Sequence, residues 1–486
     1  PLAAYGAKGV TPAKFIDEDN PDFGNVLSIT DEDLDYCRLD VDILRDSIIT
    51  MREAYRDWVK KDNADLPLTA ASLAYRVWCA NSWPEEWRYK GKKGDTYYSV
   101  TFPWAANEAA KMAYYGGKVQ VFEGFAGIEL FDVMSIDRNS MFPAEMMTKS
   151  FANPNKVWKR AASISGLRAA KSKGWCYWGH VVMKAGKNAE LFLPTIIDKK
   201  ADYNQTEYDG FLMHPEINYA LEHGWELLEV KELYVSPPCN HFQAHIGYFY
   251  EQRMRLKAAG DPRQHFIKIG PLNSLYGKFG QKDRCNRIED KESIEKITAQ
   301  DGWQTEYEVH FWNAESSKFY LTENEPSSIS KNTFFPWAAA VTSYARVELQ
   351  RTIMACRNAG LDVVYCDTDS VHVCGLESLD QIPVEIGKKL GEWDYEFAKN
   401  MPDEIIPKAI YWERKAYVWY DSKGNPIKIK HKGVSESTGD LTKEQVNISV
   451  IQPRTAMRRG LQSGYENVVP KRSSRYFRYT EKLEVR

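Results

Sequence analysis

Residues 363–373, with the sequence VVYCDTDSVHV, place two runs of β-forming residues on either side of an Asp-Thr-Asp-Ser turn. This pattern predicts a β-hairpin. Side chains alternate along an extended chain, so Asp367 and Asp369 are expected on one face at the hairpin tip. Two carboxylates held this closely repel each other unless a cation lies between them, and hard oxygen ligands suit Mg²⁺. The alternative is a plain polar turn, because Asp, Thr and Ser all favour turns.

The composition is that of a globular protein with several domains, because 486 residues exceed what one hydrophobic core holds. The 64 basic and 67 acidic residues give a net charge of -3, so no overall positive field indicates nucleic acid. Basic residues nevertheless cluster locally, and aromatic residues such as Trp158 and Trp175 lie among them, as in polynucleotide-binding tracks. A solvated surface is the alternative reading. The basic clusters are residues 156–173, 253–263, 428–432, 454–459 and 471–478.

The eight cysteines show neither a CxxC pair nor zinc-ligand spacing, which indicates reduced thiols in an intracellular protein. No apolar run reaches membrane-spanning length and no signal peptide is visible. We therefore expect a cytoplasmic protein that does not insert into membranes.

Apolar residues at steps of three and four predict a long amphipathic helix after Thr30, an N-cap residue, ending near residue 61. A second helix is expected over residues 69–80. Residues 95–143 are expected to be rich in β-structure around a Gly116-Gly117 turn. The other expected elements are strands at 118–122, 128–136, 176–183 and 191–197, a basic helical stretch at 249–279, a polar hairpin at 284–331 and a helix at 335–359.

A second acidic site is IDRNSMFP at residues 136–143. A strand delivers Asp137 to its end, and Asn139 or Ser140 then caps a helix with Pro143 in its first turn. Free N–H groups at such a helix start attract phosphate, so Asp137 would hold a metal against a triphosphate. A strand-to-helix corner with a solvated aspartate is the alternative.

A third site is GPLNSLYGKFG at residues 270–280. Asn273 and Tyr276 lie three residues apart, on one helical face, where they can present an amide and an aromatic ring to a nucleotide. Taken alone, this segment is a helix that ends at a glycine.

In this order, IDRNSMFP, LNSLYGKFG and YCDTDS resemble the three polymerase motifs of family B DNA polymerases. NSMFPAEM and LNSLYGKFG are most similar to the protein-primed branch of phages and linear plasmids, or to its primer-independent relatives. The resemblance covers nearly the whole chain from Tyr36 onward. It implies an α+β right-hand fold, with an antiparallel-sheet palm, helical fingers and a small thumb, and DNA-directed DNA polymerase activity.

The resemblance also implies residue roles. Asp137 and Asp369, with Arg138 beside them, are expected to bind two Mg²⁺ ions, for which Mn²⁺ can substitute, while Asp367 supports them. The implied nucleotide-binding residues are Ser140, Met141, Phe142, Lys268, Asn273 and Tyr276. The implied partners of this monomer are primer-template DNA, deoxynucleoside triphosphates and, in the protein-primed branch, a terminal protein. The implied setting is phage or mobile-element replication in a bacterial host.

Three shorter segments resemble DNA-contacting motifs of the family. Residues 114–117 (YYGG) are similar to the template-binding Y-x-G-G element, 342–346 (TSYAR) to the primer-gripping T-x-x-A/G-R motif, and 415–417 (KAY) to the K-x-Y motif. A Gly-Gly turn and a solvated helix are the alternatives for the first two. The implied DNA-binding residues are Tyr114, Gly116, Gly117, Thr342, Arg346, Lys415 and Tyr417.

The chain departs from the family pattern in the fingers motif, where the phosphate-binding Lys should stand four residues before Asn273. Ile269 occupies that position and Lys268 precedes it. Because proline removes a backbone hydrogen bond, Pro271 can bulge the turn and bring Lys268 back. Otherwise Lys257 or Arg263 takes this role.

Two further departures concern a sugar contact and an exonuclease site. Phe142 stands where relatives often carry Tyr, and its ring would exclude a 2′-hydroxyl by bulk; core packing is the alternative. Tyr36 and Asp40 resemble the last of three proofreading-exonuclease motifs, whose first carboxylate pair has no counterpart before Tyr36. We therefore expect no autonomous 3′–5′ exonuclease activity from these residues alone.

The resemblance divides the chain into expected segments, in which the two insertions can instead be decorative loops. These segments are an exonuclease remnant (1–68), palm (69–188), a terminal-protein-docking insertion (189–249), fingers (250–283), a DNA-wrapping insertion (284–331), palm (332–432) and thumb (433–486). A silent DNA-binding replication subunit and a primase-like enzyme remain alternatives.

Overall fold

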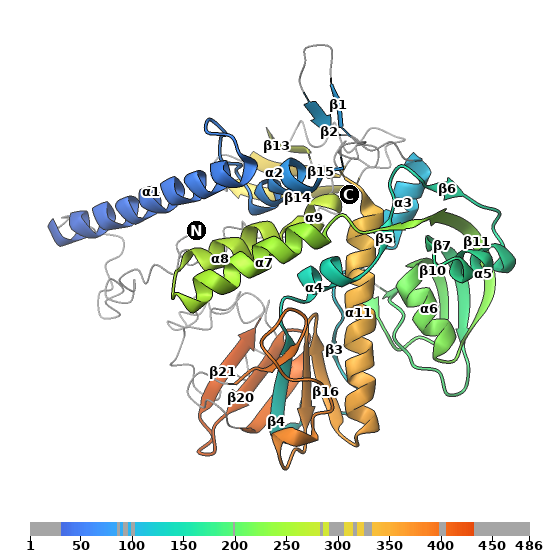
Figure 1. Cartoon of the computed structure of the whole chain (residues 1–486). Coiled ribbons are helices and arrows are strands. Elements are labelled where there is room, and N and C mark those ends of the chain that lie inside the picture. The colour runs from blue at the N-terminus through green and yellow to red at the C-terminus, as the bar shows by residue number, and fades with distance from the viewer. Residues whose placement is uncertain are drawn as a thin grey trace.

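An antiparallel sheet of eight strands, the main sheet, forms the lower part of the computed structural model in Figure 1. The structure describes residues 31–84, 88–90, 96–98, 103–197, 200–281, 285–290, 306–313, 318–324, 333–397 and 405–431. Residues 1–30 of the expected exonuclease remnant and the expected thumb at 433–486 lie outside the described residues.

The main sheet has the strand order β21-β20-β19-β4-β17-β16-β3. The eighth strand, β18, pairs with the C-terminal end of β4, beyond the part of β4 that pairs with β19. Its strands are β3 (Val119–Val121), β4 (Glu129–Arg138), β16 (Asp362–Asp367), β17 (Ser370–Cys374), β18 (Trp393–Tyr395), β19 (Ile406–Glu413), β20 (Ala416–Tyr420) and β21 (Pro426–His431). The hairpin predicted at residues 363–373 is β16–β17, and it pairs with β4, whose sequence lies more than 220 residues earlier.

The long helix α11 (Phe335–Asn358) stands between the main sheet and a smaller α/β unit (Figure 1). It packs on α6, α4, β16 and β17, so apolar and polar residues alike are buried around its circumference. Thr342 and Arg346 lie in the covered N-terminal half of this helix, which bears on the predicted DNA contacts.

The smaller unit, called here the side unit, spans residues 158–236 and has its own core. Its sheet has the order β10-β7-β11-β6, with two helices and a short hairpin. These elements are β6 (Trp158–Lys159), α5 (Ile164–Ser172), β7 (Cys176–Ala185), β8 (Thr195–Ile197), β9 (Lys200–Asp202), β10 (Glu207–Met213), α6 (His214–Glu222) and β11 (Trp225–Ser236). The expected boundary at residue 189 cuts through this unit, because β7, which we placed with the palm, pairs with β10 and β11. Alternation identifies a strand but not the sheet it joins.

A helical layer covers the upper part of Figure 1, and α1 projects from it. Its elements are α1 (Asp31–Val59), α2 (Ala70–Ser82), α3 (Trp104–Met112), α7 (Gln243–Ala258), α8 (Arg263–Ile267), a π-helical turn (Lys268–Asn273) and α9 (Leu275–Phe279). The helices predicted at residues 30–61 and 69–80 are confirmed, and the Thr69 side chain caps α2 through the N–H of Ser72. Helix α3 falls where β-structure was expected, because its four alanines favour helix.

The remaining elements are short. They are β1 (Arg88–Lys90), β2 (Thr96–Tyr98), α4 (Met141–Thr148), β5 (Phe151–Ala152), β12 (Pro238–Cys239), β13 (Cys285–Asp290), β14 (Glu306–Asn313), β15 (Lys318–Asn324) and a 3₁₀ turn (Leu379–Gln381). The expected hairpin at 284–331 contains three strands in the order β13-β15-β14. Across the described parts of the chain, no helix is both long and apolar enough to cross a bilayer.

Candidate active site

The main sheet brings the two acidic sites together. Asp137, at the end of β4, lies opposite Ser370 in β17, and the N–H of Arg138 donates to the carbonyl oxygen of Asp369 at 2.8 Å. Residues opposite each other in an antiparallel ladder have Cα atoms roughly 5 Å apart. Asp137 and Asp369 are therefore neighbours, although 232 positions separate them in the sequence.

The turn between β16 and β17 has a strained and tightly packed backbone. Thr368 adopts a φ of 62°, and its N–H donates to the Lys118 carbonyl oxygen at 2.8 Å. A Cβ atom on Gly117 would lie 2.5 Å from Thr368 Oγ1, so only glycine fits against this turn. The Gly116-Gly117 segment thus supports the turn that carries Asp367 and Asp369.

Burial and mutual repulsion disfavour the charged forms of two of the aspartates. Burial, followed by the charge of Asp369 and then that of Glu396, raises the pKa of Asp137 to about 7. Burial is also the main cause that raises the pKa of Asp369 to about 6, and the charges of Asp367 and Glu396 add to it. A cation between these carboxylates would offset both effects.

Asp367 is in a different electrostatic environment. Lys415 Nζ lies 2.7 Å from both of its carboxylate oxygens, and Lys415 holds a left-handed φ of 59°. The Lys415 N–H also donates to the Tyr365 hydroxyl at 3.1 Å. Because Asp367 already has a cationic partner, Asp137 and Asp369 are the carboxylates left for a metal ion.

These residues fit a hard divalent cation. In the part of the chain that the structure describes, no three His, Cys, Asp or Glu side chains converge into a closed metal cage. A site of two carboxylates is the pattern expected for Mg²⁺, which usually keeps several waters and shares substrate phosphates. Asp137 and Asp369 would hold it, and the main chain of Arg138 lies beside them.

A candidate anion site adjoins the aspartates at the start of α4. Ser140 stands at the N-cap position with a φ of 50°, and the first N–H groups of the helix, those of Met141 and Phe142, have no acceptor within it. Arg253 of α7 donates through Nη1 to Ser140 Oγ at 3.2 Å, while its Nε is buried without a hydrogen-bond partner. An unneutralised guanidinium at a helix N-terminus favours phosphate.

The π-helical turn at Lys268–Asn273 contains Pro271 and confirms the predicted bulge. Lys268 is exposed, and its charge opposes the rise in the pKa of Asp137, so it acts on the aspartate site. Arg263 instead forms an ion pair with Asp261 at 2.6 Å at the far end of α8. Lys257 is exposed and has no ion pair among the described residues.

Aromatic rings line the space between α4 and α9. The rings of Phe142 and Tyr276 have centroids 4.5 Å apart, with their planes tilted by 41°. Burial, followed by the charge of Asp369, raises the pKa of Tyr276. The side-chain oxygen of Asn273 is buried without a hydrogen-bond partner in the same region. Helix α4 also contacts the π-helical turn, so the structure brings Phe142, Asn273 and Tyr276 into one region.

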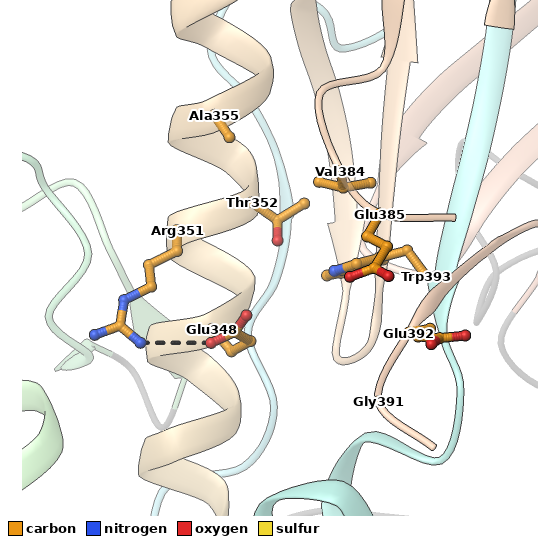
Figure 2. A pocket seen from close by; sticks show the side chains of 9 residues that line it. All are labelled: Glu348, Arg351, Thr352, Ala355, Val384, Glu385, Gly391, Glu392 and Trp393. Carbon is orange, nitrogen blue, oxygen red and sulfur yellow. Dashed lines mark hydrogen bonds and ion pairs between the residues drawn. The ribbon is translucent and has the colours of Figure 1, made fainter. Parts of the chain in front are cut away.

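A cleft of about 310 Å³ lies between α11 and residues 384–393, and Figure 2 shows the side chains that line it. It is lined by Glu348, Arg351, Thr352, Ala355, Val384, Glu385, Gly391, Glu392 and Trp393. None of the three aspartates lines it, so it is not the catalytic cleft. The wall formed by residues 391 and 392 supports the aspartate site instead. Arg138 Nε donates to the Gly391 carbonyl oxygen at 2.8 Å, and the Asn139 N–H donates to the Glu392 carbonyl oxygen at 2.9 Å.

Sequence comparison decides the family. The profile of DNA polymerase type B, organellar and viral, matches residues 14–371. The chain belongs to this family. The resemblance predicted from the three motifs is thereby confirmed, including its viral branch.

Relatives of this type B polymerase include a probable DNA polymerase of Podospora anserina, 23% identical over 427 residues that cover 82% of this chain and 33% of the relative. The DNA-directed DNA polymerase of Enterobacteria phage PRD1 is 26% identical over 346 residues, covering 69% of this chain and 54% of the relative. The chain thus spans a third to about half of these relatives. Phi29 DNA polymerase, solved with primer-template DNA and incoming nucleotides, matches in fold with a TM-score of 0.59 and 19% identity, covering 86% of this chain and 68% of that chain. The expected α+β polymerase fold is confirmed.

The structure corrects the expectation that Arg346 meets a phosphate directly. Its side chain is 1% exposed, and its Nε donates to Glu216 Oε1 of α6 at 2.8 Å. Its Nη1 donates to the carbonyl oxygens of Tyr115 and Gly116 at 2.7 and 2.8 Å. Arg346 therefore shapes the glycine segment from inside the protein. The motif identified an arginine on a helix but not which face of α11 is covered.

Two other expected DNA contacts are also buried. Thr342 donates its hydroxyl to carbonyl oxygens of its own helix, and Tyr417 is 5% exposed among the rings of Tyr365, Tyr411 and Trp419. Tyr114, Gly116, Gly117 and Lys415 retain exposed or partly exposed surface.

Sequence reasoning missed two residues and left one pair undecided. Arg253 lay in a recognised basic cluster, but nothing in the sequence singled it out. Glu396 accepts hydrogen bonds from Ser135 and Lys428. Burial acts to raise the pKa of Glu396, but the charge of Lys428 and its hydrogen bond hold that pKa below its ordinary range. The acids at 392, 394 and 396, which alternate through and beside the short strand β18, were the available signal. Tyr36 and Asp40 lie in α1, but their side chains are outside the described part of the structure.

Proposed function

We propose that this chain is a template-directed DNA polymerase that adds deoxynucleotides to a primer 3′-hydroxyl. The observation that carries the proposal is the pairing of β4 with β17, which makes Asp137 and Asp369 neighbours beside an anion-binding helix end. Membership of the type B family supports the same reading.

Asp137 and Asp369 would hold two Mg²⁺ or Mn²⁺ ions, with the main chain of Arg138 as a further ligand. When bound, such ions neutralise the triphosphate and lower the pKa of the primer hydroxyl. Asp367 keeps Lys415 oriented at the rim of the site, at 2.7 Å, where its ammonium can also reach the primer terminus.

The remaining residues bind and orient the nucleotide. The N–H groups of Met141 and Phe142, the hydroxyl of Ser140, and the cations Arg253 and Lys268 would hold the phosphates. Phe142 and Tyr276 would pack against the sugar and base, with the Asn273 side chain beside them. Tyr114, Gly116 and Gly117 would face the template, while Arg346 and Thr342 act only by holding this segment and α11 in place.

The family resemblance extends the proposal to biology. The polymerase would replicate a phage or mobile element within the host cytoplasm as a monomer, starting from a terminal protein or without a primer. The side unit, which includes most of the expected docking insertion, is the proposed contact for the priming protein.

The deciding experiment is extension of a primed DNA template with deoxynucleotides and Mg²⁺. We expect full extension, with a reaction lacking primer run in parallel. Failure of extension together with retained DNA binding would favour a silent replication subunit. Preferential use of ribonucleotides without a primer would favour a primase-like enzyme.

Replacing Phe142 by Val should raise ribonucleotide incorporation roughly 10- to 100-fold relative to deoxynucleotides, because the smaller side chain leaves room for a 2′-hydroxyl. The ratio of kcat/KM for the two nucleotides measures this effect. An unchanged ratio would assign Phe142 to packing against Tyr276 alone.

Replacing Arg253 by Ala should raise the KM for deoxynucleotides about 10- to 100-fold, because a charged hydrogen bond to phosphate contributes roughly 1.5–3 kcal/mol. The matched control is Lys257→Ala, which removes a positive charge one helical turn further along α7, from an exposed side chain. Equal effects of the two substitutions would contradict the assignment of Arg253.

A further inference from the structure

Two neighbouring tryptophans lie on an open edge of the side unit. Trp158 belongs to β6, the last strand in the order β10-β7-β11-β6, and is 41% exposed. Trp175 follows α5 and is partly buried against the core of the unit. The two ring centroids are 5.5 Å apart and the ring planes are tilted by 33°. Trp175 therefore anchors the pair, and Trp158 is the ring that solvent reaches.

Basic side chains surround the same two rings. The Arg160 guanidinium carbon lies 6.0 Å from the Trp158 ring centroid, and Lys173 Nζ lies 5.1 Å from that of Trp175. Lys156, just before β6, is exposed as well. Within the described residues, these three cations have no acidic partner, whereas Lys159, on the opposite face of β6, pairs with Glu232 at 3.5 Å.

The unpaired charges and the exposed ring favour one class of ligand. The whole chain carries a net charge of -3, so the positive charge at this edge is local and does not reflect an overall positive field. An aromatic face beside cations binds single-stranded nucleic acid, because bases stack on the ring while phosphates meet the charges. A duplex offers phosphates but hides its base faces. The edge also lies on the side of the molecule away from α7 and α8, outside the aspartate site (Figure 1).

We propose that the surface of Trp158, Trp175, Lys156, Arg160 and Lys173 binds single-stranded DNA. This second DNA contact is independent of the catalytic chemistry. It would hold an unpaired strand against the side unit while the aspartate site binds the primer terminus and the nucleotide.

Photo-crosslinking of the full chain to dT20 containing 5-iodouracil tests this contact, with crosslinked peptides identified by mass spectrometry. We expect saturable crosslinks in the peptides that contain residues 158 and 175. Trp158→Ala should raise the dT20 concentration at half-saturation of the Trp175 crosslink about 5- to 100-fold, since each stacked base contributes substantially to affinity. Trp158→Phe should restore most of the binding because it keeps an aromatic face.

The salt dependence provides a second measurement. For single strands, each phosphate neutralised contributes about 0.7 to the slope of log K against log salt concentration. The double variant Arg160→Ala/Lys173→Ala should therefore lower the magnitude of the slope by about 1.4. Lys184→Ala is the matched control, because Lys184 lies on the same unit near the other end of β7, roughly 30 Å from Trp175. It should leave the midpoint and slope unchanged.

Three outcomes would overturn the proposal. The first is an unchanged midpoint in both Trp158→Ala and the double variant. The second is tighter binding of rU20 than of dT20 at this surface, which would assign it to RNA. The third is loss of an oligomer in Trp158→Ala without a change in dT20 binding, which would make the edge a contact between copies of the chain.

Discussion

Asp137→Asn and Asp369→Asn are each expected to lower the rate of nucleotide incorporation by at least about a thousandfold. Losing one carboxylate removes a ligand for ions that contribute several kcal/mol to transition-state stabilisation, and each 1.4 kcal/mol corresponds to a tenfold change in rate. Single-turnover extension across a range of Mg²⁺ and Mn²⁺ concentrations measures the loss. The affinity of each variant for primer-template DNA, measured in EDTA, should stay within a few-fold of the affinity of the original protein.

Asp394→Asn is the matched control, because Asp394 lies directly opposite Asp137 on β18 but its carboxylate pairs with Lys388 at 2.6 Å. It should retain activity. A second readout distinguishes catalytic loss from misfolding. The pKa of Asp137 rises from 3.8 to about 7 on folding, so the folded state loses stability as pH rises through this window. Without metal at pH 8, the Asn variants should therefore unfold at a temperature no lower than the original protein. Near-normal extension by either variant would contradict the site assignment.

Arg346→Met and Glu216→Gln are each expected to destabilise the fold by about 3–5 kcal/mol. Both side chains are almost fully buried, at 1% and 0% exposure, and removing one partner leaves a buried group without its counterpart. Arg346→Met also removes the donors to Tyr115 and Gly116, so extension should fall even at temperatures where the variant is folded. Denaturant unfolding and extension rates measure the two effects.

The double variant Arg346→Met/Glu216→Leu should recover much of the stability, because it removes both buried charges together. It should not recover the extension rate, since the carbonyl oxygens of the glycine segment still lack their donor. Lys184→Met, which removes one partner of the exposed pair Lys184–Glu207, should change stability by less than about 1 kcal/mol. Equal losses in the buried and exposed variants would contradict this account of α11.

Much of the local structure followed from spacing alone. The β16–β17 hairpin was predicted from alternation around an Asp-Thr-Asp-Ser turn, and α1 from a stripe of apolar residues. The π turn at Lys268–Asn273 followed from one proline in a helical motif. Each of these depends on residues that are near neighbours in the sequence, so local chemistry was enough.

Contacts between distant segments were not predictable in the same way. Arg253 is indistinguishable by sequence from Arg255 or Lys257, yet only the fold brings it to Ser140, 113 positions away. Glu396 neighbours the aspartates because β18 pairs with β4. The strand β7 was recognised as a strand in the segment expected to be palm, but its pairing with β10 and β11 was not predictable, because its apolar residues suit either sheet.

By itself, the sequence determined the three motifs, the family and the aspartates on which the chemistry rests. Only the tertiary structure decided how each acid and each arginine is used: Lys415 pairs with Asp367 and leaves Asp137 and Asp369 available for a metal ion, and Glu216 pairs with Arg346 inside the protein. The physical reason is that a side chain's role depends on its partner and its exposure to water. Partners that lie 48 and 130 positions away are set by strand pairing and helix packing, not by local spacing.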